Sequence, residues 1–469
     1  MYPISVETLC DLTDGTIQGP VSTAVQIDGV VIDSRDARRG DAFFALQGHR
    51  QHGMQFATAA LRDGAAVIVT DPSAFEGRQA GVTTPCVVVP DAEIALAQIA
   101  QHNRRSSDAL VIAVTGSVGK TTTRKLITCV METTHTGIQS PRNFNNHLGV
   151  PLSLLELQPG DEFAVIEIAA SGPGEVAVLS AIAEPEMAVV TRVAPAHLAG
   201  FGTLQAVQQA KQELVKGLPQ SGVAFLNADD PQVLKMAAAT RARVVTFGES
   251  ETADVRATDV VVTDSQLQFR VNGFGYDVPI CGLHNLTNVL AAIAVGLEVG
   301  LDEQQIAAGL QRFEAAPGRC CVSAVGPWTV VDDTYNASPA SVSAAIRFVD
   351  DYHNCHRRIV VLNDMLDLGD QSSDLHFGIG AALAASTVDH VAVLGEFSND
   401  VIDGFLAAGG SINRISGFRD LHLMASMLDC LLSPGDLVLI KGSRATRMEQ
   451  VAGLLANLAA AETSLRTAA

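Results

Sequence analysis

The sequence predicts an α/β protein of three domains, with a parallel sheet and a phosphate-binding loop (P-loop) in the central domain and a smaller Rossmann-like domain at the C-terminal end. Short apolar runs alternate with helical segments along most of the 469 residues, which is typical of a doubly wound parallel sheet. One such run, Ala109–Val114, leads directly into the glycine turn Gly116–Gly119 and a helical segment. A strand, a glycine turn and a helix N-terminus form a cradle for phosphate groups.

The chain length is enough for about three domains of ordinary size. We place them at residues 1–108, 109–316 and 317–469, with Ala315–Arg319 as the linker before the third. The strands expected in the first domain are Val25–Ile32, Ala42–Leu46, Ala65–Thr70 and Cys86–Val89, followed by a helix over Ala92–Arg105. In the second domain we expect strands over Phe163–Ile168, Met187–Val193, Val223–Leu226 and Val244–Phe247, and in the third domain strands over Trp328–Asp332, Ile359–Leu362, Val391–Leu394 and Leu437–Ile440, with a helix over Ser341–Asp351.

The composition narrows the function classes. The formal net charge is −20 and the pI is about 4.9, which argues against binding to nucleic acid or to an anionic membrane surface. There is no secretory signal pattern and no apolar run as long as a membrane-spanning helix, so we expect a cytoplasmic protein without membrane insertion. The eight cysteines form no C-x-x-C pair, which favours reduced thiols over a zinc site.

The P-loop is the most informative motif, although Val114 stands where the general pattern has its first glycine. Lys120 is expected to reach the β and γ phosphates of ATP, and the Thr121 hydroxyl to bind Mg²⁺. A glycine turn that only caps a helix is the alternative, and the Lys-Thr pair directly after Gly119 argues against it. The expected ATP contacts of the loop are Thr115, Gly116, Ser117, Gly119, Lys120, Thr121 and Thr122.

Polar side chains follow later strands of the same domain. Glu167 lies near the end of an apolar strand, where a carboxylate is costly unless a cation holds it, so we interpret it as a Mg²⁺ ligand. His197 follows the next strand, and Lys211 begins a later helical segment. Taken singly, Glu167 is more often a satisfied strand-end residue, and His197 and Lys211 are more often solvated surface groups.

Asn285 and Asn288 are three residues apart and therefore share one face of a helix. An amide offers a donor and an acceptor together, as the edge of adenine requires. The alternative for Asn285 is an ordinary helix N-cap.

Several further sequence motifs support a family resemblance over nearly the whole chain. The loop and the order Glu167, His197, Lys211 resemble those of the Mur ligases. Other matching motifs are Asp33–Arg35, Gly40–Gly48, Asn143–Pro151, Asp332–Pro339, Asp364–Gly369 and Lys441–Arg444. Together they are similar to the Mur ligases that add D-alanyl-D-alanine to UDP-N-acetylmuramoyl-tripeptide, and they imply the three-domain architecture of that family.

The resemblance implies roles for individual positions. Lys120 and Thr121 bind ATP phosphates and Mg²⁺, Glu167 and His197 bind two magnesium ions, and Lys211 carries a carbamate that helps to hold the second ion. Lys120, Glu167, His197 and Lys211 are thereby the implied catalytic set. The remaining implied contacts are Asn285 and Asn288 near adenine, Arg319 and Asp333 on the phosphate and ribose side of ATP, Ser34 and Arg35 at the UDP end of the substrate, Asn145 and Asn146 near the acyl substrate, and Asn336, Asp364 and Leu368 near the incoming dipeptide.

The implied activity is ADP-forming amide ligation through an acyl phosphate, in peptidoglycan precursor synthesis and hence in cell-wall growth, cell shape and division, by a monomer. The chain departs from the family pattern at His52, Ala169, Cys320–Cys321, Ser338 and Asn363. Three alternatives stay open: a ligase on the same scaffold that joins another amine to another carboxylate, a P-loop ATPase or small-molecule kinase, and a non-catalytic binding homologue.

Overall fold

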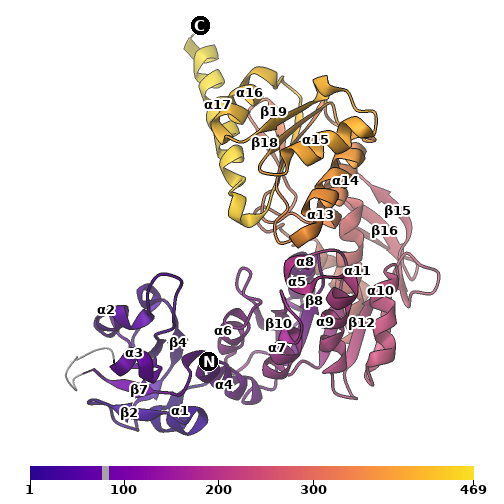
Figure 1. The fold of residues 1–469 in the computed structure, drawn as a ribbon. Helices are drawn as coiled ribbons and strands as arrows, with labels where there is room; N and C mark the ends of the chain where they lie inside the picture. The colour runs from indigo at the N-terminus through magenta and orange to yellow at the C-terminus, as the bar shows by residue number, and fades with distance from the viewer. Residues whose placement is uncertain (77–83, 469) are drawn as a thin grey trace.

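The computed structural model describes residues 1–76 and 84–468, which form three α/β units in succession along the chain (Figure 1). The middle unit (magenta) contacts both the N-terminal unit (indigo) beside it and the C-terminal unit (orange to yellow). The predicted fold class, a central parallel sheet with a second α/β unit at the C-terminal end, is confirmed. Among the described residues no helix is long and apolar enough to cross a membrane.

The N-terminal unit is built on a sheet with the strand order β2-β7-β6-β5-β4. The prediction of one strand over Val25–Ile32 is wrong, because the chain changes sheets at Asp28: β3 pairs with β1, whereas β4 pairs with β5. The elements are β1 (Ile4–Ser5), α1 (Val6–Thr13), β2 (Thr16–Gln18), β3 (Gln26–Ile27), β4 (Gly29–Val31), η1 (Ser34–Asp36), β5 (Asp41–Phe44), η2 (Gly53–Phe56), α2 (Ala57–Asp63), β6 (Val67–Thr70), α3 (Pro72–Glu76), β7 (Cys86–Val88) and α4 (Ala92–Arg105).

Helix α4 begins and ends at the predicted residues and joins the first two units. Its N-terminus is capped by Asp91, whose side chain accepts hydrogen bonds from two backbone N–H groups of the first turn. Its buried face packs on α1 and on helices of the middle unit, so that one apolar core continues through both units. Asn103 Nδ2 donates to the carbonyls of Leu154 (2.8 Å) and Leu157 (3.2 Å) across this boundary.

The middle unit contains a parallel sheet with the order β14-β13-β12-β11-β8-β10-β9. Strand β8 leads into the P-loop and pairs with β10 on one side and β11 on the other. In sheets of this kind, ligands bind at the carboxyl ends of the strands, at the point where the strand order reverses. The elements are β8 (Leu110–Thr115), α5 (Lys120–Met131), β9 (Gly137–Gln139), α6 (Gly149–Leu155), β10 (Phe163–Glu167), α7 (Glu175–Ala183), β11 (Met187–Val190), α8 (Leu198–Phe201), α9 (Leu204–Lys216), β12 (Val223–Asn227), α10 (Pro231–Leu234), η3 (Lys235–Ala239), β13 (Arg243–Gly248), β14 (Val255–Arg256), η4 (Leu283–Asn285), α11 (Leu286–Glu298) and α12 (Glu303–Leu310).

An antiparallel sheet, which the sequence analysis did not predict, follows β14. It consists of β15 (Thr258–Val262), β16 (Leu267–Val271) and β17 (Phe274–Val278). Apolar and polar residues alternate along β16, and Asn272-Gly273 forms the turn into β17. Such an Asn-Gly pair between alternating runs is a strong hairpin signal, so this element was predictable.

The C-terminal unit has a sheet with the order β18-β19-β23-β20-β21-β22, in which β18 runs antiparallel to β19. Apolar clusters cover both faces of the sheet. The elements are β18 (Cys321–Val325), β19 (Trp328–Asp333), α13 (Pro339–Asp351), β20 (Arg358–Asn363), η5 (Gly369–Gln371), α14 (Ser372–Ala384), β21 (His390–Leu394), α15 (Ser398–Ala407), η6 (Ile412–Arg414), β22 (Ile415–Phe418), α16 (Leu421–Leu431), β23 (Leu437–Lys441), η7 (Arg444–Thr446) and α17 (Glu449–Ala468).

Candidate active site

The P-loop connects β8 to α5 at the centre of the middle sheet. Gly116 and Gly119 have φ values of +153° and +86°, a region that residues with a side chain rarely adopt. A Cβ atom on Gly116 would lie 1.9 Å from Thr191 Oγ1, and one on Gly119 would lie 2.3 Å from Asn288 Oδ1. Backbone conformation and close neighbours therefore both require glycine here, and the predicted strand, turn and helix are present.

The tip of the loop is fixed by the segment that follows β11. The Ser117 N–H donates to the carbonyl of Arg192 (2.7 Å), and Ser117 Oγ donates to the carbonyl of Ala194 (2.8 Å). Thr115 is fully buried at the end of β8, and Thr122 lies in the first turn of α5. The Ser117 side chain, a predicted ATP contact, thus also shapes the loop.

Glu167 is the carboxylate around which the site is organised. It ends β10 and is 1% exposed. Thr121 Oγ1 donates to Glu167 Oε2 (2.9 Å), and Asn145 Nδ2 donates to Glu167 Oε1 (2.7 Å). Arg124 Nη1 lies 3.7 Å from Glu167 Oε2. These partners compensate the burial of the charge, and they place a hydroxyl and a carboxylate side by side, which are oxygen ligands of the kind that Mg²⁺ binds.

Lys120 is the first residue of α5 and lies within the loop. Its Nζ donates to the carbonyl of Gly116 (2.9 Å). Burial lowers the pKa of Lys120, while Glu167 opposes this shift and the positive charge of Arg319 adds to it. Lys120, Glu167 and Arg319 therefore act on one another electrostatically, and an anion in the loop is met by cations from two units.

Lys211 and His197 are close enough to Lys120 to interact with its charge. Lys211 is 4% exposed, and within residues 1–76 and 84–468 its amine has no hydrogen-bond or ion-pair partner. Burial, with a contribution from Lys120, lowers the pKa of Lys211 to about 7. Burial also lowers the pKa of His197; Lys120 and Lys211 add to that shift and Asp367 opposes it. Three predicted catalytic side chains thus share one polar region.

His197 is positioned from two units. It has a left-handed backbone (φ +51°) and precedes α8. Its Nδ1 lies 3.5 Å from Asp367 Oδ2 of the C-terminal unit, and the Asp367 carbonyl accepts from the N–H of Ala199 (3.1 Å). The C-terminal unit is therefore seated directly on the predicted metal-binding side of the middle unit.

The predicted adenine contacts form a chain of hydrogen bonds beneath the loop. Thr123 Oγ1 donates to Asn288 Oδ1 (3.1 Å), Asn288 Nδ2 donates to Asn285 Oδ1 (2.8 Å), and Asn285 Nδ2 donates to the carbonyl of Cys281 (2.7 Å). Both asparagines are 6% exposed. In this arrangement Asn288 supports Gly119 from below, a role that the sequence did not indicate.

Replacement Asn288→Ala is expected to lower the free energy of unfolding by about 1–3 kcal/mol, because Thr123 and Asn285 each lose a buried partner. ATP affinity is expected to fall as well, since the loop loses its support. Calorimetric ATP titration and urea unfolding measure the two effects. Unchanged stability and ATP affinity would contradict this role.

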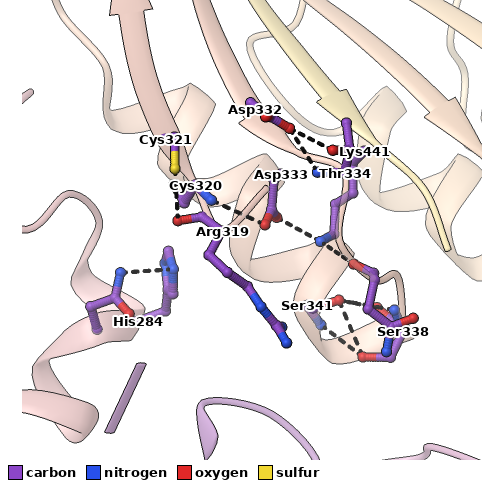
Figure 2. Close-up of polar contacts among 12 residues, drawn as sticks. His284, Arg319, Cys320, Cys321, Asp332, Asp333, Thr334, Ser338, Ser341 and Lys441 are labelled. Atoms are coloured by element: carbon purple, nitrogen blue, oxygen red, sulfur yellow. Dashed lines mark hydrogen bonds and ion pairs between the residues drawn. The ribbon is translucent and has the colours of Figure 1, made fainter. Parts of the chain in front are cut away.

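Arg319 brings the C-terminal unit to the P-loop. Its Nη2 donates to Thr121 Oγ1 (3.3 Å), and its guanidinium carbon lies 3.9 Å from the centre of the Tyr335 ring. Figure 2 shows the Arg319 side chain extending away from Asp333 and Lys441, which lie deeper in the C-terminal unit.

Asp333 is bound on both oxygens. Lys441 Nζ lies 2.5 Å from Asp333 Oδ2 and also donates to the carbonyl of Asn336 (2.9 Å). The Cys320 N–H donates to Asp333 Oδ1 (3.2 Å). Figure 2 shows the contact between Lys441 and Asp333. Lys441, which is 1% exposed, thus links the predicted nucleotide contact Asp333 with the predicted dipeptide contact Asn336.

Replacement Lys441→Met is expected to cost about 3–5 kcal/mol of stability, because it leaves the Asp333 charge largely buried without its cation. The control is Arg444→Met, since Arg444 is an exposed residue paired at 3.6 Å with Glu449 and such pairs contribute about 0–1 kcal/mol. Urea unfolding of both variants measures the difference. Equal stabilities of the two variants would contradict the importance of the buried pair.

Two other predicted dipeptide contacts lie inside the C-terminal unit. Asp364 is 8% exposed, and its carboxylate accepts from the N–H groups of Glu396 (2.7 Å) and Phe397 (3.1 Å). Leu368 is 2% exposed and belongs to the apolar core. Asp364 therefore fixes the turn before α15, and contact of either residue with a dipeptide stays a prediction.

Of the predicted contacts for UDP and the acyl substrate, Ser34, Arg35 and Asn146 have no contact with the P-loop among the interactions of the described residues. Ser34 is buried in η1, and the exposed Arg35 pairs with Asp33 of the same turn. Asn146 Oδ1 accepts from the N–H of Gly149 (2.9 Å) at the start of α6. Only Asn145 reaches the site described above, through Glu167.

Three residues of the site were not singled out from the sequence: Arg124, Tyr335 and Asp367. Arg124 follows the P-loop by one helical turn, so its place on the inner face of α5 was predictable. Tyr335 and Asp367 lie in motifs that resemble those of the Mur ligases. Nothing in their spacing indicates that Tyr335 contacts Arg319 or that Asp367 contacts His197.

Comparisons with known proteins agree with this geometry. Residues 26–104 match the model of the Mur ligase family catalytic domain, residues 114–296 the Mur ligase middle domain, and residues 312–444 the Mur ligase glutamate ligase domain. UDP-N-acetylmuramoyl-tripeptide–D-alanyl-D-alanine ligases are 30% identical in Bacillus subtilis (strain 168) and 32% identical in Escherichia coli (strain K12), in each case over 96% of this chain and 98% of the relative.

Solved structures give the same result. A crystal structure of MurF from Acinetobacter baumannii superposes with a TM-score of 0.86 at 29% identity, covering 97% of this chain and 99% of that one. MurF ligase from Thermotoga maritima in complex with ADP has a TM-score of 0.80 at 28% identity, covering 92% and 98%. With its P-loop site and its relatives along nearly the full length, the chain belongs to the Mur ligase family.

Proposed function

We propose that this chain is an ADP-forming ligase that uses ATP to join D-alanyl-D-alanine to UDP-N-acetylmuramoyl-tripeptide in peptidoglycan precursor synthesis. The observation that carries the proposal is the hydrogen bond from Arg319, in the C-terminal unit, to Thr121 of the P-loop, which in turn donates to Glu167. ATP bound to this loop lies between two units, which is the placement that a two-step ligation requires. The relatives that carry this ligase name support the choice of substrates.

In the proposed reaction the terminal carboxylate of the tripeptide attacks the γ-phosphorus of ATP, the bond to the β–γ bridging oxygen breaks, and ADP leaves an acyl phosphate. The amine of the dipeptide then attacks the acyl carbon, loses a proton and displaces phosphate. Lys120, Arg319 and the N-terminus of α5 neutralise the charge that shifts onto the phosphate oxygens. The C-terminal unit, packed on the loop, keeps water from the acyl phosphate.

The residues present fit magnesium. No group of three or more His, Cys, Asp or Glu side chains in the part of the chain that the structure describes is arranged as a metal site by itself. The hydrogen-bonded pair of Thr121 and Glu167 nevertheless offers two oxygen ligands, and a carbamate on Lys211 adds two more beside His197. These four residues would hold two ions, which when bound neutralise the negative charge of the phosphates.

The carbamate is supported by the surroundings of Lys211. A buried ammonium without an anionic partner is costly, and Lys211 has no such partner among the described residues. The lowered pKa of about 7 leaves part of the amine neutral. The neutral nitrogen forms a bond to the carbon of CO₂ and releases one proton to solvent. The resulting carbamate is an anion, which interacts favourably with the positive charge of Lys120.

The other predicted contacts complete the proposal. The three predicted domains, 1–108, 109–316 and 317–469, supply the binding site for the UDP end of the substrate, the ATP site and the dipeptide site, respectively. The proposed protein acts as a monomer. ATP and a UDP-linked intermediate are cytoplasmic metabolites, which supports a cytoplasmic location. The proposed contacts outside the P-loop site are Ser34 and Arg35 for UDP, Asn145 and Asn146 for the acyl substrate, and Asn336, Asp364 and Leu368 for the dipeptide.

The test is phosphate release from MgATP in the presence of UDP-N-acetylmuramoyl-tripeptide, with and without D-alanyl-D-alanine. A ligase releases phosphate in proportion to the amide product and needs both substrates. Steady release without the dipeptide indicates an ATPase, and ADP formation with a stable phosphorylated product indicates a kinase. Turnover with a different amine but not with this dipeptide would replace the substrate and keep the reaction class.

A further inference from the structure

Arg319 differs from Arg124, the other arginine of the site, in how its positive charge is compensated. Arg124 lies 3.7 Å from Glu167, whereas Arg319 has no carboxylate oxygen within 4.0 Å among the described residues. Its Nε is buried without a hydrogen-bond partner, and its hydrogen bond to Thr121 is long, at 3.3 Å. Polar contacts alone therefore do not fix this guanidinium.

The aromatic ring of Tyr335 supplies the missing support. The guanidinium carbon of Arg319 lies 3.9 Å from the ring centre, well within the range of a cation–π contact. A planar guanidinium stacks on such a face without giving up its N–H donors. Because the ring carries no formal charge, it orients Arg319 and leaves the positive charge available to an anion.

The backbone brings the ring and the guanidinium together. The Tyr335 N–H donates to the carbonyl of Gly318 (3.0 Å) and thereby joins the linker to the end of β19. Gly318 has φ +72°, and a Cβ atom there would lie 3.0 Å from Tyr335 N and 3.2 Å from Tyr335 Cβ. The linker glycine and Tyr335 thus form one rigid support, on which Arg319 is the next residue.

We infer that Tyr335 is a positioning residue that holds Arg319 over the P-loop, with its charge unpaired, for the polyphosphate of ATP. The inference rests on the proposed function only in taking ATP as the ligand. It gives a role to Tyr335, the tyrosine of the motif Asp332–Pro339.

The experiment is a double-mutant cycle in the full-length protein, read as the equilibrium affinity for a non-hydrolysable ATP analogue with an imido β–γ bridge, measured by calorimetry. The variants are Tyr335→Leu, Tyr335→Phe, Arg319→Ala and Tyr335→Leu combined with Arg319→Ala. Tyr335→Leu is expected to weaken binding about tenfold, the loss of one half-buried cation–π contact. Tyr335→Phe is expected to stay within about twofold of the wild type, because the ring face remains.

The decisive comparison is the Arg319→Ala background. There Tyr335→Leu is expected to change affinity by less than about twofold, since the ring has no cation left to position. A purely structural role would weaken binding equally in both backgrounds, and that result overturns the inference. A Tyr335→Phe variant as weak as Tyr335→Leu, or a Tyr335→Leu variant with wild-type affinity, overturns it too. If Tyr335→Leu does not fold, Tyr335→Met takes its place in the cycle.

Steady-state kinetics provide a second readout. In a ligase assay Tyr335→Leu is expected to lower kcat/KM for ATP while KM for the UDP-linked substrate stays unchanged. Because analogue binding requires no turnover, the cycle tests the positioning role even if the proposed substrates give no product. Failure of the proposed function therefore shows as absent turnover in the wild type, and failure of this inference shows as a missing coupling energy.

Discussion

A Lys211→Ala variant is expected to lose at least about 10²-fold in the rate of ADP formation, because the proposed second magnesium ion loses an oxygen ligand. Removal of a residue that only hydrogen-bonds to a metal ligand already lowers metal affinity or activity by about 10–100-fold. Lys211→Arg is expected to fail equally, since arginine keeps a positive charge but cannot carry a carbamate. If the free ammonium contacted phosphate directly, the arginine variant would instead retain activity.

Chemical rescue separates these explanations further. A short-chain carboxylic acid added to Lys211→Ala is expected to restore part of the rate, because it returns an oxygen anion to the space beside the metal. The matched control is Lys216→Ala, an exposed lysine on the same helix, which is expected to keep the wild-type rate. An active Lys211→Arg variant, or a Lys211→Ala variant at the wild-type rate, ends the carbamate hypothesis.

A Lys120→Ala variant is expected to lose about 10²–10³-fold in turnover, the usual effect of removing one preorganised group that stabilises transition-state charge. The control lies five residues along the same helix: Lys125 Nζ donates to the carbonyl of Glu314 (2.7 Å), and Lys125→Ala is expected to leave turnover unchanged. ADP release with the full substrate set measures both variants. Near-native release by Lys120→Ala would refute the phosphate assignment.

Local patterns were sufficient for much of the site. The P-loop was predictable because strand, glycines, lysine and threonine are consecutive, so their geometry follows from the backbone alone. Glu167 was predictable as a site residue because a carboxylate at the end of an apolar strand needs a partner. The partners themselves, Arg124 and Asn145, required the packing of α5 and of the loop before α6 against β10.

Contacts between units had no local signal. Nothing in the sequence spacing places Tyr335 under Arg319, Asp367 beside His197, or Lys441 between Asp333 and Asn336. Each of these contacts depends on the seating of the C-terminal unit on the middle unit or on the strand register of β19 and β23, where Asp333 and Lys441 are paired neighbours. The antiparallel strands β15–β17 are different, because the Asn272-Gly273 turn did signal them.

The sequence by itself determined the fold class, the P-loop and the family, because these depend on residues that are adjacent or ordered along the chain. Only the tertiary structure decided which charges are paired. Glu167 and Asp333 are each compensated by a buried cation, whereas Arg319 and Lys211 have no carboxylate partner among the described residues. The physical reason is that compensation of a charge depends on distances of a few ångströms between distant segments, and packing, not sequence spacing, sets those distances.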